Sequence, residues 1–292
     1  MDFLRCNDCP RGCNADRESS VGICGVGNKF RVARIAPHMW EEPPVSGKNG
    51  SGTVFFSGCN LGCVFCQNRD ISRGKKGADY DTDALLCEIL SMIEKHKVHN
   101  VNLVTPTHYS TALIPLLQKL RSATSLPVVW NSSGYESVEM LRRLEGLVDV
   151  YLPDFKYASG EVAKKYSSAA NYPDVATAAI LEMYRQTGGV KFSDEGLITS
   201  GLILRHLVLP GERQDSMKVL DTVASILPIK DIRLSLMSQY TPDFALDSPY
   251  KNLHRRVTAF EYDSVLKRAV ALGFEGYFQG RSSAQKSYTP NF

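Results

Sequence analysis

Short apolar or β-branched runs alternate with longer amphipathic segments through most of this 292-residue chain. The short runs are typical of buried strands, and apolar residues at helical spacing are typical of surface helices. We expect strands at residues 53–57, 100–105, 127–131, 149–153, 201–209, 231–237 and 275–278, and helices at 82–96, 109–123, 137–144, 172–187, 213–226 and 262–272. Such alternation predicts an α/β fold in which crossover helices join parallel strands. An open doubly wound sheet and a barrel both satisfy it.

The first part of the chain has a different composition from this body. It is rich in cysteine, and residues 37–52 (PHMWEEPPVSGKNGSG) are rich in Pro, Gly and Ser, which is typical of a loop-like linker. We therefore expect a Cys-rich N-terminal segment with its linker at residues 1–52 and one core domain at residues 53–292.

Composition and charge narrow the class of protein. The chain is 43% apolar and 22% charged, which excludes intrinsic disorder and fibrous proteins. Its 34 Lys and Arg against 31 Asp and Glu leave a net charge of +3, too slight to argue for nucleic acid or an anionic membrane as partner. No apolar run approaches the ~20 residues that span a bilayer, and the N-terminus lacks a signal-peptide pattern. A cytoplasmic location is expected.

The eight cysteines fall into two clusters and one isolated residue. Four lie within the first 24 residues, three lie at positions 59–66, and Cys87 stands alone in an expected helix, where a buried apolar role is the simplest interpretation. Clustered thiols in a reducing compartment bind metal far more often than they form disulfides. The two clusters are therefore candidate metal sites.

The second cluster, Cys59-Asn-Leu-Gly-Cys63-Val-Phe-Cys66, directly follows an expected strand. Its three thiolates are one too few for a closed tetrahedral zinc site or a fully ligated four-iron cluster. A [4Fe–4S] cluster held here would keep one iron open to a small-molecule ligand. The alternative is that a distant fourth ligand closes an inert zinc or iron site.

The spacing Cys-x3-Cys-x-aromatic-Cys, with Phe65 as the aromatic residue, resembles that of radical S-adenosylmethionine (SAM) enzymes. Asn60 and the following Gln67-Asn68 are similar to the pyruvate formate-lyase activating enzymes. The resemblance implies a partial TIM-like (β/α)6 barrel. It also implies a [4Fe–4S] cluster on Cys59, Cys63 and Cys66, with S-adenosylmethionine on its open iron.

Further residues resemble SAM-contacting positions of those enzymes. Asp154 and Lys156 match an Asp-x-Lys strand end, and the Asn131-Ser-Ser133-Gly turn is similar to a Thr-Asn-Gly turn under the cofactor. The resemblance implies that Phe65, Asn131 and Ser133 border adenosine and that Asp154 and Lys156 make polar contacts at the sugar or carboxylate.

The strand at residues 202–209, followed by Pro-Gly, also resembles a strand of the family. Arg205 and His206 are neighbours on it, so their side chains point to opposite faces. We expect Arg205 to point inward to a carboxylate, because its planar fork suits bidentate pairing.

One stretch departs from the superfamily pattern. Most members carry Gly-Gly-Glu after the second strand and hold the SAM amino group there, whereas this chain has Val104-Thr105-Pro-Thr107-His108-Tyr109. Thr105 and Thr107 can accept hydrogen bonds from an ammonium, but the carboxylate is missing. A cofactor contact and a positioning role are equally open for His108. This departure, the N-terminal cysteines and the Ser-Gln-Tyr-Thr-Pro stretch at 238–242 are similar to the PflX-like branch.

Cys6, Cys9, Cys13 and Cys24 supply four thiolates within reach of one metal centre. A closed zinc site and a second iron–sulfur cluster fit these ligands equally well, and unliganded cysteines are a lesser third possibility. Spacing alone does not separate these alternatives.

The resemblance implies an enzyme that cleaves SAM reductively to a 5′-deoxyadenosyl radical for hydrogen abstraction. The difficult chemistry belongs to the cofactor, so no side chain is expected to act as acid or base.

The expected partners are a low-potential electron donor (flavodoxin or ferredoxin) and a glycyl-radical protein. The basic residues Arg69, Arg73, Lys75 and Lys76 either dock that donor or form a solvated loop. The alternatives are radical modification of a peptide, amino acid or small metabolite, and a non-enzymatic iron–sulfur or zinc protein that transfers electrons or binds a partner.

Overall fold

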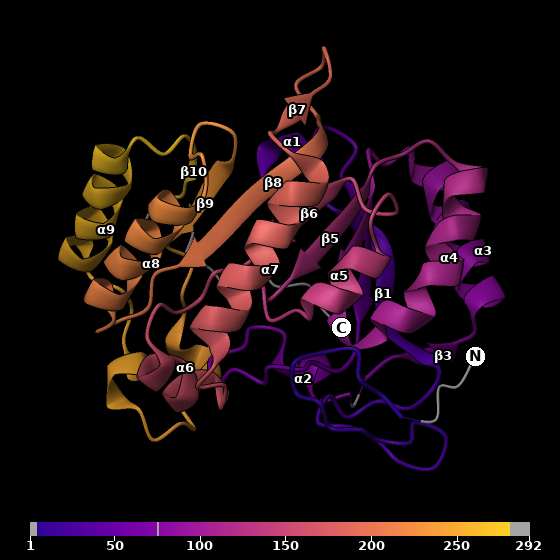
Figure 1. Cartoon of the computed structure of the whole chain (residues 1–292), viewed down its shortest axis with the longest axis horizontal. Helices are drawn as coiled ribbons and strands as arrows, with labels where there is room; N and C mark the ends of the chain where they lie inside the picture. Colours follow the sequence, from indigo (N-terminus) through magenta and orange to yellow (C-terminus); the bar gives the residue numbers. More distant parts are fainter. Residues whose placement is uncertain (1–4, 75, 281–292) are drawn as a thin grey trace.

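The computed structural model describes residues 5–74 and 76–280. They form a mixed α/β fold around one sheet, which Figure 1 shows edge to edge. The strands in this part of the chain are β1 (Phe30–His38), β2 (Ser51–Phe56), β3 (Ala78–Tyr80), β4 (Val101–Val104), β5 (Val128–Ser132), β6 (Val150–Pro153), β7 (Lys191–Phe192), β8 (Ile198–Leu207), β9 (Arg233–Met237) and β10 (Gly276–Phe278).

The order of the strands in the sheet is β10-β9-β8-β6-β5-β4-β2-β1-β3, and β7 pairs with β8. The run from β2 to β10 is parallel, and its strands follow one another in chain order. A doubly wound sheet would reverse direction at a switch point, so that alternative is excluded. Within the described residues β10 and β3 form the two edges without pairing, so the sheet is open and closure into a barrel is not seen.

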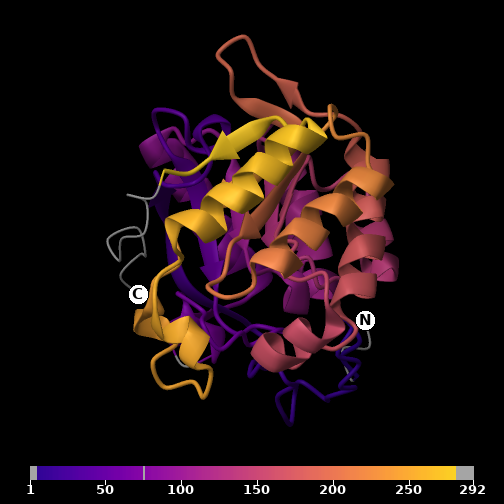
Figure 2. The ribbon, with the colours of Figure 1, turned by 90° about the vertical axis from the view of Figure 1, so that its left-hand side faces the viewer.

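The longer helices lie across one face of this sheet (Figures 1 and 2). This follows from the strand order, because right-handed crossovers that always advance in the same direction place the crossover helices on the same side. The helices are α1 (Pro43–Ser46), α2 (Arg69–Ser72), α3 (Thr82–His96), α4 (Ser110–Ala123), α5 (Val138–Arg143), α6 (Gly160–Ser167), α7 (Tyr172–Thr187), α8 (Arg213–Ile226) and α9 (Ala259–Leu272). The longer ones, α3, α4, α7, α8 and α9, form the covering layer.

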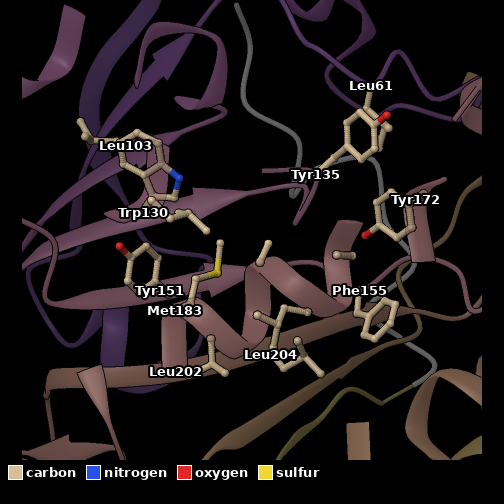
Figure 3. Close-up of a cluster of buried hydrophobic side chains, with 14 of the residues drawn as sticks. Leu61, Leu103, Trp130, Tyr135, Tyr151, Phe155, Tyr172, Met183, Leu202 and Leu204 are labelled. Atoms are coloured by element: carbon tan, nitrogen blue, oxygen red, sulfur yellow. The ribbon is translucent and has the colours of Figure 1, made fainter. Parts of the chain in front are cut away.

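The main core fills the space between the helices and the sheet. Figure 3 shows Trp130 of β5, Tyr151 of β6 and Leu204 of β8 beside Met183 of α7, all fully buried. Residues one position away on these strands point to the other face, where Val129, Val150, Leu152 and Ile203 pack with Val45 of α1 in a smaller apolar cluster. Both faces of the parallel sheet are therefore covered near the amino ends of the strands, which explains their nearly continuous apolar sequences.

The periodic helices begin and end close to the predicted positions. Helices α3, α7 and α8 have the expected bounds, and Asp81 caps α3 by accepting a hydrogen bond from the Ala84 amide at 2.9 Å. Helix α9 begins at Ala259, before the expected residue 262, because Thr258 and Glu261 form a capping box. Cys87 is exposed on α3, so the expected buried role is wrong.

Residues 37–52 do not form a linker. They contain the end of β1, helix α1 and the beginning of β2, and β1 pairs antiparallel with both β2 and β3. The stretch is thus continuous with the sheet. In contrast, the segment before it has neither helix nor strand over residues 5–29, and it lies at the end of the sheet to which β8 points (Figure 1, indigo).

Among the described residues, no helix combines the length and apolar character needed to cross a membrane.

The buried contacts of Leu204 predict a large loss of stability on truncation. Leu204→Ala is expected to lower the free energy of unfolding by about 2–5 kcal/mol, because it removes buried apolar atoms and leaves a cavity. Leu246→Ala is the control, since its side chain is 56% exposed and should change stability by no more than about 0.5 kcal/mol. Urea unfolding of both variants measures this. Equal effects would contradict the assignment of Leu204 to the core.

Candidate functional site

A cavity of about 440 Å³ opens at the carboxyl ends of the parallel strands, on the face opposite the helix layer. Its size falls within the ~300–1,000 Å³ typical of small-molecule sites. The lining comprises the three-cysteine loop, residues that follow β4, β5 and β6, side chains of β8, β9 and β10, and the segment between β1 and α1. Among these residues are Trp40, Glu41, Glu42, Phe55, Cys59, Cys63, Phe65, Cys66, Val104, Thr105, Asn131, Ser133, Asp154, Lys156, Arg205, Leu207, Ser235, Met237, Tyr277 and Gln279.

The three-cysteine loop leaves β2 through a turn that requires glycine. Gly58 has φ +88°, and a Cβ there would lie 2.7 Å from the Cys24 carbonyl oxygen. The turn brings Cys59, Cys63 and Cys66 to one wall of the cavity. Phe65 lies between them, buried against the rings of Tyr166 and Tyr240 at centroid distances of 6.3 and 6.2 Å.

Hydrogen-bond donors surround these three sulfur atoms. Leu61 N–H donates to Cys59 Sγ at 3.3 Å, and the Ser167 hydroxyl donates to Cys63 Sγ at 3.0 Å. Cys66 receives the hydroxyl of Ser72 and the amide of Asn68. Donors aimed at sulfur stabilise a thiolate, which is the form that binds metal. The loop therefore fits a group bound through three thiolates.

The cysteines do not converge on a single ion. In residues 5–74 and 76–280, no group of three or more His, Cys, Asp or Glu side chains is arranged to hold one metal ion. In an iron–sulfur cluster each thiolate binds its own iron, so the sulfurs stand apart around the cluster. Burial raises the pKa of the Cys59 thiol and raises the pKa of Cys66 to about 12, so a bound metal is needed to keep these thiols ionised.

A network of charged residues lines the same cavity. The Arg205 guanidinium donates to Asp154 Oδ1 at 3.0 Å and to Asn131 Oδ1 at 2.6 Å. Lys156 Nζ donates to the second oxygen of Asp154 at 2.5 Å. Burial by itself would raise the pKa of Asp154, but Arg205 and Lys156 outweigh it, so the pKa lies below its ordinary value and the carboxylate is ionised.

Two glutamates that sequence reasoning missed also lie in this cavity. Glu41 accepts hydrogen bonds from Asn102 and Asn131, each at 3.1 Å, and pairs with Arg205 at 3.4 Å. Oε2 of the neighbouring Glu42 is buried and has no hydrogen-bond partner among the described residues. Burial raises the pKa of both carboxyl groups. The segment between β1 and α1 thus supplies carboxylates to a cavity whose β4 end lacks one.

Backbone geometry is unusual where β4 and β5 enter the cavity. Thr105 has φ +59°, a region that β-branched residues rarely adopt, and its amide donates to the Asn131 carbonyl at 2.8 Å. Gly134, φ +73°, allows the β5 loop to touch the β6 end, because a Cβ there would lie 2.3 Å from the Asp154 carbonyl oxygen. Such strain persists only where the surroundings fix it, and it is common at functional sites.

Two of the predicted cofactor-binding residues lie outside the cavity lining. Thr107 donates to buried Glu136 at 2.6 Å, and His108 Nε2 is 2.9 Å from the Ser57 carbonyl oxygen beneath the three-cysteine loop. Burial lowers the pKa of His108 to about 3, so the ring is neutral. His206 is also buried away from the cavity, with Nδ1 2.7 Å from the Phe155 carbonyl oxygen. Arg205 is the one of the pair that faces the cavity, as expected.

A second depression lies outside the three-cysteine loop. Its volume is about 580 Å³, and it is lined by Cys63, Arg69, Arg73 and Lys76 together with Phe244 and Asp247. Arg69 pairs with Asp247 at 3.4 Å and Lys76 with Asp70 at 3.0 Å, all with exposed side chains. Lys75, expected in the same basic group, lies outside the described residues.

The N-terminal cysteines lie under the same loop. Cys6, Cys9 and Cys24 are buried and Cys13 is partly buried, and Cys9 is close enough to the other three to interact with each electrostatically. The Cys24 carbonyl accepts a hydrogen bond from the Cys59 amide at 3.3 Å, so the two cysteine clusters are in direct backbone contact.

The burial of His108 predicts a pH-dependent effect on stability. Between pH 6.5 and pH 3 the unfolded chain binds a proton at this ring that the folded protein does not, so the wild type loses stability as the pH falls. His108→Gln removes this contribution, and its stability relative to the wild type should improve on acidification. Urea unfolding from pH 7 to pH 4 measures the difference, with His254→Gln on an exposed turn as the control. A difference independent of pH would contradict the prediction.

Comparisons with known proteins agree with this geometry. Residues 45–170 match a family described as a 4Fe–4S single cluster domain. The fold is similar to the crystal structure of a radical SAM methyltransferase from Sphaerobacter thermophilus, with a TM-score of 0.53 and 13% identity over 80% of this chain and 68% of that one. An uncharacterized protein of Methanocaldococcus jannaschii is 31% identical over 275 residues, which cover 91% of this chain and 75% of that protein.

The match from residue 45 to residue 170 includes the three-cysteine loop, the strained turn after β4 and the Asp154–Lys156 strand end. The chain therefore belongs to the family of the uncharacterized Methanocaldococcus jannaschii protein; its residues 45–170 are similar to a 4Fe–4S single cluster domain, and its fold is similar to that of the methyltransferase.

Proposed function

We propose that this protein is a radical SAM enzyme that cleaves S-adenosylmethionine reductively and uses the resulting radical for hydrogen abstraction. The observation that carries this proposal is the position of Cys59, Cys63 and Cys66 in the lining of a cavity at the carboxyl ends of parallel strands. Three thiolates leave one iron of a [4Fe–4S] cluster open. When bound, the cluster supplies the electron that converts SAM to methionine and a 5′-deoxyadenosyl radical.

The residues of the cavity match the polar groups of SAM. The carboxylate and ribose hydroxyls of SAM can form hydrogen bonds with the Arg205–Asp154–Lys156 network, whose charged groups are already held in place by ion pairs. The SAM ammonium suits an acceptor such as Glu42 Oε2, which is buried in the cavity with no hydrogen-bond partner among the described residues. Phe65 and the Asn131–Ser133 turn border the adenosine in this arrangement.

The apolar part of the lining protects a radical from water and from side reactions. Phe55, Val104, Leu207 and Met237 face the cavity from neighbouring strands. Holding the reacting atoms in one geometry and excluding water are the main contributions that a protein makes to cofactor chemistry.

The hydrogen donor that we favour is a glycyl residue of a partner enzyme. The resemblance of the three-cysteine loop to activating enzymes supports this choice. An acidic low-potential electron donor would dock at the depression beside Cys63, whose lining has three basic residues, Arg69, Arg73 and Lys76, against the two acidic residues Asp70 and Asp247.

Product analysis separates the glycyl-radical role from its rival. Anaerobic reaction with SAM, dithionite and a glycyl-radical protein should give a radical signal on the added protein in electron paramagnetic resonance. Methylated or oxidised peptides, amino acids or metabolites without that signal would favour direct modification.

Loss of any loop cysteine should abolish SAM cleavage. Cys59→Ala, Cys63→Ala and Cys66→Ala are each expected to lower 5′-deoxyadenosine formation by at least about 100-fold, since each removes a cluster ligand. Cys87→Ala is the matched control and should keep the wild-type rate, because Cys87 is exposed on α3. The assay is nucleoside formation by iron-reconstituted protein with SAM and dithionite. SAM cleavage retained in any of the three loop variants would contradict the proposal.

The Arg205 network should contribute to SAM affinity. Arg205→Gln is expected to weaken SAM binding about 10- to 100-fold, because hydrogen bonds to charged groups contribute about 1.5–3 kcal/mol each. Equilibrium binding to the reconstituted protein measures this, together with its iron content, which should not change. Arg233→Gln is the control, since Arg233 pairs with Glu275 outside the cavity. Unaltered affinity in Arg205→Gln would place SAM elsewhere.

A further inference from the structure

The N-terminal cysteines form a compact group in a segment that has no secondary structure of its own. Residues 5–29 contain neither helix nor strand, yet Cys6, Cys9 and Cys24 are buried. The few backbone hydrogen bonds within the segment include Cys6 N–H to the Ala15 carbonyl at 2.8 Å. In a segment with so little regular structure, a metal bound by the thiols would supply folding free energy.

Glycine keeps open the space beside two of these sulfurs. A Cβ on Gly22 would lie 2.8 Å from Cys13 Sγ and 3.7 Å from Cys24 Sγ. The φ of Gly22 is not positive, so its backbone does not require glycine. Glycine is therefore required at position 22 for steric reasons: a larger side chain would collide with the sulfurs and with a group bound between them.

A buried cation points into the same group. Arg17 is only 8% exposed and donates to Cys24 Sγ at 3.7 Å, while its Nε is buried with no hydrogen-bond partner among the described residues. Its guanidinium lies over the ring of Tyr109 at 5.6 Å. A buried guanidinium is costly unless negative charge faces it, and the Asp8 carboxylate supplies one such charge. Thiolates of Cys24 and Cys6 on a metal centre would supply more at the same place.

The group is fastened to the three-cysteine loop. Arg11, between Cys9 and Cys13, donates to the carbonyls of Asn60 at 2.7 Å and Leu61 at 3.1 Å. Together with the Cys24–Cys59 backbone hydrogen bond, this places a centre held by the N-terminal thiols next to one held by the loop.

We propose that Cys6, Cys9, Cys13 and Cys24 bind a second [4Fe–4S] cluster, directly behind the three-cysteine loop. Among the described residues no three Cys, His, Asp or Glu side chains are arranged around one ion, which favours a cluster, whose thiolates each bind a separate iron, over zinc. Hydrogen bonds and charges at the sulfurs set the reduction potential of an iron–sulfur cluster, whereas zinc has no redox chemistry for them to tune. All four irons of this cluster have a protein ligand, so it has no open position for SAM. The proposal does not depend on SAM cleavage.

Iron analysis of the full chain tests the assignment. After anaerobic reconstitution the wild type should hold about eight irons, and the variant with Cys59, Cys63 and Cys66 all changed to Ala should keep about four in a cluster that SAM does not perturb. About four irons in the wild type and almost none in the triple variant would overturn the proposal. So would one tightly bound zinc per chain that iron does not replace.

Two variants keep all eight cysteines and avoid the risk that thiol removal unfolds the segment. Gly22→Ala should lower iron from about eight to about four per chain while the SAM-responsive signal in electron paramagnetic resonance remains. Gly189→Ala is its control, since a Cβ there meets only ordinary contacts at 3.5 Å or more. Full iron content in Gly22→Ala would contradict the proposed site.

Arg17→Gln should lower the reduction potential of the cluster that does not respond to SAM, because a positive charge beside its sulfurs is lost. Arg268→Gln removes a surface ion pair with Asp221 and should leave both potentials unchanged. A potential that is the same in Arg17→Gln and wild type would contradict a redox centre at these thiols.

Discussion

Parallel pairing of the strands in chain order is the constraint on which the site depends. It brings the carboxyl ends of β2, β4, β5, β6, β8 and β9 to the same end of the sheet. The short segments that follow these strands therefore share one cavity. Residues as distant in sequence as Cys59 and Arg205 thus line the same space. Because the crossover helices lie on the other face, the cavity face is free to carry polar groups at this end and a small apolar cluster at the other.

The buried charges of this cavity are costly to the fold. Arg205, Asp154, Lys156 and Glu41 are removed from water, and ion pairs in such places only partly offset the loss of hydration. Apolar residues of similar volume would give the folded state at least the same stability. The arrangement of the charged residues is understandable as a preformed site for a polar ligand, because charges already held by one another need little reorganisation when that ligand binds.

The sequence predicts the helices and the parallel strands well because both faces of the sheet are buried and the periodicity is strong. Helices α3, α7 and α8 have the expected bounds, and the three cysteines of the loop lie where the strand pattern places them. The glutamates at 41 and 42 could not be found in this way. They lie in a stretch whose Pro, Gly and Ser content is that of a linker, and only the pairing of β1 with β2 brings them to the cavity.

The sequence did not predict which side chains of the turn after β4 face the cavity. Thr105 and His108 are three residues apart in the same turn, yet one lines the cavity and the other lies beneath the loop. The left-handed backbone at Thr105 redirects the chain there, and no local propensity predicts such a conformation for a β-branched residue. Cys87 illustrates a smaller error: it lies two residues from both buried Leu85 and buried Ile89, about 200° around the helix, and so on the exposed face.

The contacts of Arg11 have a consequence for the order in which the protein assembles during synthesis. Its guanidinium also bonds to the carbonyls of Ser167 and Ser168, and the latter is 157 residues further along the chain. The segment that supports the three-cysteine loop cannot reach its final position until α6 has left the ribosome. The cysteines of both clusters therefore precede these carbonyls in synthesis, and the contacts that support the loop are completed only after residue 168 has been made.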